Sequence, residues 1–184
     1  LDARGVAPAP VPIARWFGAA GEQYMEKYDA TPDLFAKVSV KSRRHAANNP
    51  YALLTTPITE EEVLNSPLIY GDYMTRFMAC PPTCGAAAAL IVSDGFARHH
   101  TLPGCIEITA QSLTTDTEQS WDDPILAIGS ENVQRAANEV YEIAGIGPED
   151  VDVVELHDCF TPNEVIAYEG LGLCGEGEAT RFVA

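Results

Sequence analysis

The first part of the chain has its apolar residues at mixed helical spacing. Two segments, 18–28 and 31–45, show this spacing over several turns. Thr31 directly before Pro32 is typical of a helix start, because threonine suits the N-cap and proline suits the first turn. The pattern therefore predicts a mainly helical region over 13–79.

Breakers and caps divide this part of the chain. Residues 1–12 are rich in proline and alanine and predict an extended arm. The Asn-Asn-Pro-Tyr sequence at 48–51 predicts a turn. Thr59 is followed by three glutamates, with Glu62 at the capping-box position, so we expect another short helix to begin there.

The pattern changes after 80–82. A continuous apolar run at 86–92 is typical of a strand buried on both faces. Apolar and polar residues alternate over 105–111, which predicts a second strand, and 151–156 is predicted to be a third. Helices are predicted at 94–100, 131–144 and 161–171, with N-caps at Ser93 and Ser130 and stops at Gly145 and Gly172. Because strands alternate with helices, residues 80–184 are predicted to form a layered α/β core.

A loop with an imidazole and a thiol follows the third predicted strand. His157, Asp158 and Cys159 occupy it, and α/β sheets place their sites at the carboxyl ends of strands. Thr161 and Glu164 read as a capping box, so we expect the helix dipole to stabilise the Cys159 thiolate. Such a pair suits proton transfer or acyl chemistry at a carbonyl. The alternative is a buried structural cysteine and a hydrogen-bonded histidine, with Asp158 in a turn or cap.

The charge of the chain excludes some partners. The 184 residues include 11 Lys and Arg against 27 Asp and Glu, a net charge of −16, which would repel nucleic acid and anionic membranes. Against this background Lys37, Lys41, Arg43 and Arg44 lie within eight positions of one predicted helix. They form either a solvated helix face or a site for an anionic ligand.

The cysteines indicate a reducing environment. There are five, an odd number without a regular framework, and neither a signal peptide nor an apolar run of about 18 residues accompanies them. We therefore expect an intracellular, cytoplasmic protein. Cys80 and Cys84 lack a second pair at zinc-site spacing, so we expect no metal.

A long motif occupies the end of the chain. It reads HDCF at 157–160, Asn-Glu at 163–164 and YEGLGLC at 168–174. This resembles the HDCF region of the thiolase superfamily, of the sterol carrier protein x type, also called lipid-transfer-protein-like thiolases. Further segments resemble the loop region and core of that family, so that the resemblance covers roughly 12–184; they lie at 26–28, 35–37, 48–51 and 80–89.

The resemblance implies a partial thiolase-like α/β fold, the middle of an enzyme about twice as long. It implies that His157 helps to form an oxyanion hole and that Cys159 moves a proton to and from the attacking carbon. The nucleophilic Cys and the Gly-His-Pro motif of the family are absent from this sequence, and Cys84 stands where the family usually has Asp. Cys84 sits in a Thr-Cys-Gly turn, but its context aligns with a buried strand. We expect the missing strands to leave sheet edges unpaired and apolar faces open.

The resemblance implies an acyl-CoA thiolase that cleaves or forms 3-oxoacyl-CoA in lipid or sterol side-chain metabolism, with a coenzyme A thioester as substrate and no permanently bound cofactor. We expect the 184-residue chain by itself to be incomplete and inactive as a thiolase. The basic residues from Lys37 to Arg44 would contact the phosphates of coenzyme A, an assignment that rests on charge alone. A homodimer or homotetramer without membrane insertion, peroxisomal if eukaryotic, is expected. Two alternatives are a thiolase-fold aldolase that acts with a partner subunit and a non-catalytic acyl-CoA or lipid carrier. Such aldolases tend to have Tyr in place of His157.

Overall fold

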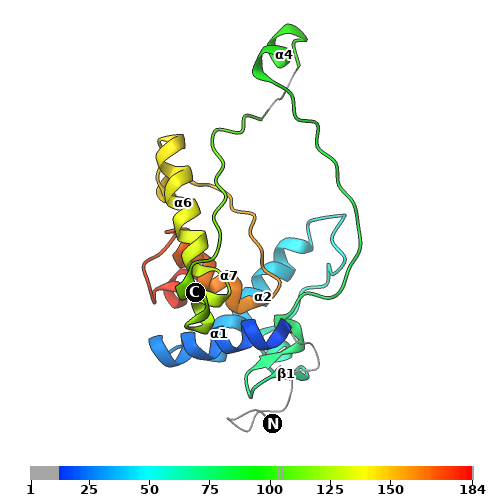
Figure 1. Ribbon diagram of the computed structural model, residues 1–184. Coiled ribbons are helices and arrows are strands. Elements are labelled where there is room, and N and C mark those ends of the chain that lie inside the picture. The colour runs from blue at the N-terminus through cyan, green and yellow to red at the C-terminus, as the bar shows by residue number, and fades with distance from the viewer. Residues whose placement is uncertain (1–12, 103, 105, 184) are drawn as a thin grey trace.

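Helices dominate the architecture, which we describe from a computed structural model for residues 13–102, 104 and 106–183 (Figure 1). The predicted arm at 1–12 lies outside the described residues. In chain order the elements are α1 (Ile13–Tyr28), α2 (Pro32–Ala46), α3 (Glu60–Leu64), β1 (Leu68–Tyr70), β2 (Met74–Thr75), η1 (Arg76–Met78), α4 (Asp94–His99), η2 (Glu118–Trp121), α5 (Pro124–Ala127), α6 (Ser130–Ala144), η3 (Pro148–Asp150), α7 (Thr161–Gly170) and α8 (Ala179–Phe182). No helix in this described part is long and apolar enough to cross a membrane.

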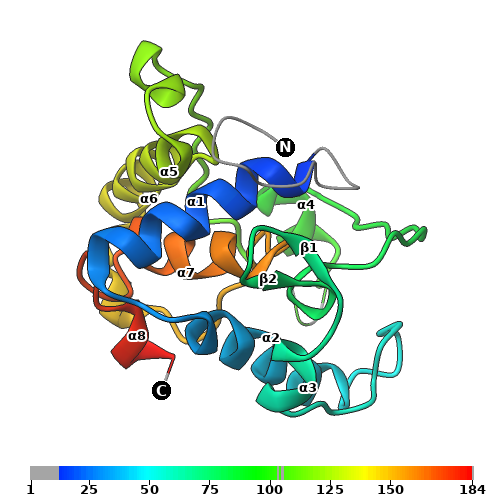
Figure 2. The same ribbon diagram turned by 90° about the horizontal axis from the view of Figure 1, so that it is seen from below.

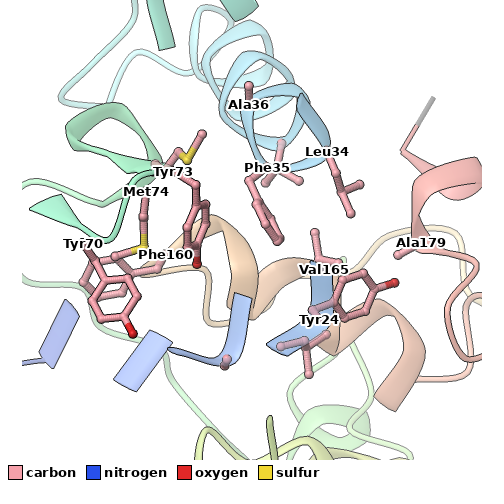
Figure 3. Close-up of a cluster of buried hydrophobic side chains, with 14 of the residues drawn as sticks. Tyr24, Leu34, Phe35, Ala36, Tyr70, Tyr73, Met74, Phe160, Val165 and Ala179 are labelled. Atoms are coloured by element: carbon pink, nitrogen blue, oxygen red, sulfur yellow. The ribbon is translucent and has the colours of Figure 1, made fainter. Parts of the chain in front are cut away.

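Helix α7 is the centre of the packing. It contacts α1, α2, α6 and α8, and Figure 2 shows it between α1 and α2. Seven of its ten residues are buried, which is the pattern expected of a helix enclosed on several sides. Val165 packs in the cluster that also includes Tyr24 of α1 and Phe35 of α2 (Figure 3). The helix therefore joins the first and last parts of the chain in one core.

Two glycines let α1 approach the start of α7 and the β1–β2 hairpin. A side-chain carbon on Gly21 would overlap the Tyr73 hydroxyl and lie 2.9 Å from Pro162. A side-chain carbon on Gly18 would overlap the ring of Tyr70. In the space that these glycines leave, the Tyr73 hydroxyl donates a hydrogen bond of 2.7 Å to the Gly18 carbonyl.

Several predicted helix ends are confirmed, and two caps are wrong. Thr59 and Glu62 form the predicted capping box of α3. The hydroxyl of Ser93 caps α4 as predicted. Helix α6 is capped by Gly129 instead of Ser130. At α7, Phe160 is the N-cap, so that Thr161 already lies inside the helix and its predicted capping box with Glu164 does not form.

The three predicted strands are wrong for this structure. Segments 86–92, 106–111 and 151–156 are extended, but among the described residues the named strands are β1 and β2, which form an antiparallel hairpin. A strand exists only where a neighbour accepts its hydrogen bonds, and these segments have none there. Figure 1 shows the chain beyond η1 running far out to α4 and back.

The exposed side chains of these segments agree with the expectation of open apolar faces. Leu90 is 87% exposed, Ile106 is 95% exposed and Val153 is 80% exposed. Side chains of this size contribute stability only when they leave water, so apolar runs of this composition are typical of strands inside a sheet. The extended segments therefore have the sequence of buried strands without the neighbours that would bury them.

Candidate functional site

The loop at 157–160 is anchored at both of its ends. The Cys80 amide donates a hydrogen bond of 2.9 Å to the Cys159 carbonyl, next to an isolated antiparallel bridge between Ala79 and Phe160. The side-chain amide of Asn163 donates to the His157 carbonyl. The buried Phe160 ring stacks on Phe17 of α1 at 4.9 Å between centroids. These contacts hold the loop against the first turn of α7.

Cys159 is a half-buried thiol, and its environment favours the neutral form. Burial raises the pKa of the Cys159 thiol to about 11, and the nearby Cys80 thiol adds to the rise. The prediction that the helix dipole stabilises the thiolate is therefore wrong, because the loss of hydration outweighs the hydrogen bonds from backbone amides. With its pKa at about 11, this side chain is a neutral thiol at neutral pH.

His157 and Asp158 are both exposed, beside the half-buried thiol. Asp158 lines a small cavity of about 150 Å³ together with Arg43, Cys80 and Thr161. The Thr161 hydroxyl is buried and has no hydrogen-bond partner in the structure. The imidazole of His157 is thus open to a ligand approaching from solvent, and the adjacent hollow has a mixed lining of polar and apolar residues.

The four basic residues of α2 divide between two cavities. Lys37, Lys41 and Arg44 line a cavity of about 590 Å³. Its wall also includes apolar and acidic residues, among them Val40, Val154, Tyr168, Phe182, Glu60 and Asp152. Arg43 instead lies 5.9 Å from the centroid of the Phe77 ring and lines the small cavity near Asp158. Arg43 is therefore separate from the other three cations of the predicted cluster.

Lys41 is further set apart by a buried partner. Its ammonium group donates to the Glu164 carboxylate and, at 2.7 Å, to the Tyr168 hydroxyl. The Glu164 side chain is 4% exposed, and it also accepts a hydrogen bond from Tyr168. A carboxylate so deeply buried requires a compensating cation. Lys41 is therefore part of the packing between α2 and α7. Lys37 and Arg44, which also line the larger cavity, take no part in the ion pair between Lys41 and Glu164.

Sequence reasoning assigned no place in the site to three of these residues. The sequence presents Cys80 in a C-x3-C pair and in the family-like segment 80–89, Asn163 in the family-like motif, and Thr161 as a cap. The signal for Asn163 was its position three residues into the segment after HDCF, within reach of the loop backbone. No local pattern marks Cys80, because its partner lies 79 positions further along the chain.

Comparisons with known proteins place the chain in a family. Residues 112–184 match the family described as Thiolase C-terminal domain-like. The chain is 42% identical over 182 residues to sterol carrier protein 2 of Bos taurus, covering 97% of this chain and 33% of that protein. It is 35% identical over 167 residues to the benzoylsuccinyl-CoA thiolase subunit BbsB of Thauera aromatica, a match that covers 91% of this chain and 43% of that subunit. The chain belongs to the thiolase superfamily.

A solved structure supports the fold of this thiolase-superfamily chain. The chain is similar to a chain of the solved structure titled "Ltp2-ChsH2(DUF35) aldolase", with a TM-score of 0.73 and 27% sequence identity. The match covers 92% of this chain and 45% of the chain in that structure. The predicted thiolase-like fold is thereby confirmed as a partial one. The chain spans about a third of the length of the sterol carrier protein 2 relatives that it matches.

Proposed function

We propose that this thiolase-superfamily chain contributes the acid/base loop of an acyl-CoA thiolase. The observation that supports this most is the neutral, half-buried Cys159 thiol on a loop anchored at the start of α7. The Thauera aromatica relative is named a thiolase subunit, and a Methanothermobacter relative with 32% identity is named acetyl-CoA acetyltransferase. The substrate would be a 3-oxoacyl-CoA, handled without a permanently bound cofactor.

Two residues of the loop, Cys159 and His157, have a chemical role in this proposal. In thiolysis the Cys159 thiol would donate its proton to the carbon that leaves as an enolate. In condensation the thiolate would remove that proton again. The His157 imidazole would donate a hydrogen bond to the thioester or enolate oxygen as negative charge develops there. The acylated nucleophile would be a cysteine that this sequence does not supply.

The larger cavity on α2 is our proposed contact for the phosphates of coenzyme A. Lys37 and Arg44 offer positive charge at the cavity, and Val40 and Phe182 offer apolar surface beside them. Lys41 is left out of this proposal because Glu164 neutralises it, and Arg43 is left out because it lines the other cavity. Glu60 and Asp152 also line the cavity, so the contact depends on Lys37 and Arg44, for which the described part of the chain shows no salt bridge.

Changing Lys37 and Arg44 together to alanine is expected to raise KM for acyl-CoA roughly tenfold, because hydrogen bonds to charged groups contribute about 1.5–3 kcal/mol each before solvent screening. Turnover should change little, since remote phosphate contacts bind ground and transition states alike, and the effect should weaken as salt rises. Arg98→Ala on the distant α4 is the control for loss of charge (Figure 1). A KM that stays at the wild-type value would contradict the assignment.

A second candidate function is an aldolase that acts with a partner subunit. It is favoured by the solved structure, whose title names an aldolase and a second component. The intact His157 argues for the thiolase, because aldolase relatives tend to have Tyr there. A third candidate, a lipid or acyl-CoA carrier without catalysis, is suggested by the name sterol carrier protein 2.

One assay of the protein at its natural length separates the three. A thiolase converts a 3-oxoacyl-CoA plus coenzyme A into two acyl-CoA products. An aldolase cleaves a 3-hydroxyacyl-CoA without added coenzyme A and requires its partner subunit. A carrier binds acyl-CoA and changes neither substrate. Thiolytic turnover above the rate without protein is the result that we expect, and its absence in folded protein would contradict the proposal.

A further inference from the structure

Two cysteines lie opposite each other where the chain enters the candidate loop. Ala79 and Phe160 form an isolated antiparallel bridge. One residue further along each segment, the Cys80 amide donates to the Cys159 carbonyl at 2.9 Å. In an antiparallel arrangement this register places Cys80 opposite Cys159, joined by this one backbone hydrogen bond, and the two side chains leave the backbone on the same side.

This register is compatible with a disulfide. Opposed residues in a hydrogen-bonded antiparallel pair have Cα atoms about 5.5 Å apart, and disulfides span Cα separations of about 4.4–6.8 Å. The Cβ atoms of such pairs are about 4.5–5.5 Å apart and a disulfide needs about 3.5–4.5 Å, so the two segments must approach slightly. The bridge is isolated, and the extended chain after Cys80 has no strand partner among the described residues, so little resists that movement.

A separate observation places the two thiols near each other. After burial, the Cys80 thiol is the largest influence that raises the pKa of Cys159, an electrostatic effect that requires proximity. Both cysteines are free in the structure, and Cys80 is exposed whereas Cys159 is half-buried. An oxidant from solvent therefore meets Cys80 first.

We propose that Cys80 and Cys159 are a redox-sensitive pair that a small-molecule disulfide of the glutathione class converts to an intramolecular disulfide. The consequence for catalysis rests on the proposed function: a Cys159 sulfur bound to Cys80 holds no proton and can neither donate nor accept one. Disulfides in reducing compartments are transient and often serve as redox sensors, which fits a reversible bond at this position.

The chemistry balances in two exchange steps. The Cys80 thiolate attacks one sulfur of the small-molecule disulfide, a mixed disulfide forms on Cys80, and one small thiolate leaves. The Cys159 thiol then loses its proton and attacks the Cys80 sulfur, which releases the second small thiolate. In total the protein loses two electrons and two protons as its disulfide forms. The small-molecule disulfide takes up these electrons and protons and becomes two small thiols. An excess of small thiol runs the steps in reverse.

The other described cysteines are not equivalent. Cys84 is exposed on the same extended segment but lies four residues beyond the bridge. Cys174 lines a different cavity, with Tyr24 and Glu169, on the far end of α7. Cys84 is therefore the matched control for an exposed thiol in the same segment.

The test uses the protein at its natural length and oxidised glutathione as the probe. After oxidation, free thiols are blocked with iodoacetamide, and the protein is digested with trypsin and a glutamate-specific protease. Mass spectrometry should find peptide 77–98 joined to peptide 156–164, a cleavage pattern that separates Cys159 from Cys174. The crosslink should survive in Cys84→Ser, disappear in Cys80→Ser and reverse with dithiothreitol.

Two results would overturn the pair: Cys80 holding glutathione while Cys159 is alkylated, or a crosslink that survives in Cys80→Ser and disappears in Cys84→Ser. Activity is measured in parallel. Each protein is compared with itself before oxidation. Oxidised wild type should lose thiolytic turnover in proportion to the crosslinked fraction, whereas oxidised Cys80→Ser should keep the turnover that it has before oxidation. A fully crosslinked protein with unchanged turnover would overturn the regulatory role and the acid/base role of Cys159 together, while the mapped disulfide would still establish the pair.

Discussion

Cys159→Ala is expected to lower thiolytic turnover by about 10²–10⁴-fold, the range over which a positioned acid or base accelerates proton transfer. The variant loses the group that protonates the leaving carbon, but not the nucleophile. The protein should therefore still accept an acyl group, visible as a mass increase of the intact protein, and fail at breaking or making the carbon–carbon bond. His157→Ala should lower kcat by about 10²–10³ through loss of an oxyanion donor, and His157→Gln should recover part of it.

The matched control for this loss is Cys174→Ala. Cys174 is also half-buried, and burial likewise raises the pKa of its thiol to about 11, but it lies beyond the opposite end of α7. Its removal should leave kcat near the wild-type value. A melting curve for each variant separates lost chemistry from lost stability. Near-normal kcat in a folded Cys159→Ala protein would contradict the acid/base assignment.

The raised pKa of Cys159 gives the two reaction directions opposite pH dependences. Cleavage requires the protonated thiol, so this group should sustain it until the pH approaches about 11. Condensation requires the thiolate, whose fraction rises about tenfold per pH unit below that pKa. The rate of condensation should therefore increase with pH over a range in which the rate of cleavage is unaffected by Cys159.

Features set by local sequence were predictable. The Thr59–Glu62 box and the Ser93 cap depend on residues three positions apart, and both form as expected. The box at Thr161 and Glu164 has the same local pattern and fails, because Lys41 of α2 binds the Glu164 carboxylate from 123 positions away. A tertiary ion pair with a buried carboxylate outweighs a cap that water can replace.

The strand predictions failed for a different reason. An apolar run such as 86–92 indicates burial between neighbours, and the described residues supply no such neighbours. Relatives about three times as long have room for them. In contrast, the division of the basic run follows from helix geometry: Lys37, Lys41 and Arg44 are four and three positions apart on one face, and Arg43 is out of phase with them.

The ion pair between Lys41 and Glu164 is expected to dominate the contact between α2 and α7. Lys41→Met leaves the Glu164 carboxylate buried, with Tyr168 as its one remaining hydrogen-bond partner among the described residues. The free energy of unfolding should therefore fall by about 3 kcal/mol, the lower end for breaking a buried pair. The lower end applies because the Lys41 side chain is 31% exposed and partly hydrated. Glu164→Gln should cost less, about 1–2 kcal/mol, because the amide still accepts from Tyr168 and Lys41 can reach water.

A double-mutant cycle in urea isolates the pair. The variant with both changes should be more stable than the sum of the single losses predicts, with a coupling energy of about 1–3 kcal/mol. Lys37→Met is the control, since Lys37 lies one turn earlier on the same face and has no contact with Glu164, and its effect should stay within about 0.5 kcal/mol. The coupling should persist at high salt, because buried charges are screened little. Equal stabilities of Lys41→Met and Lys37→Met would show that the buried carboxylate is not held by Lys41, and would return Lys41 to the cations available for coenzyme A.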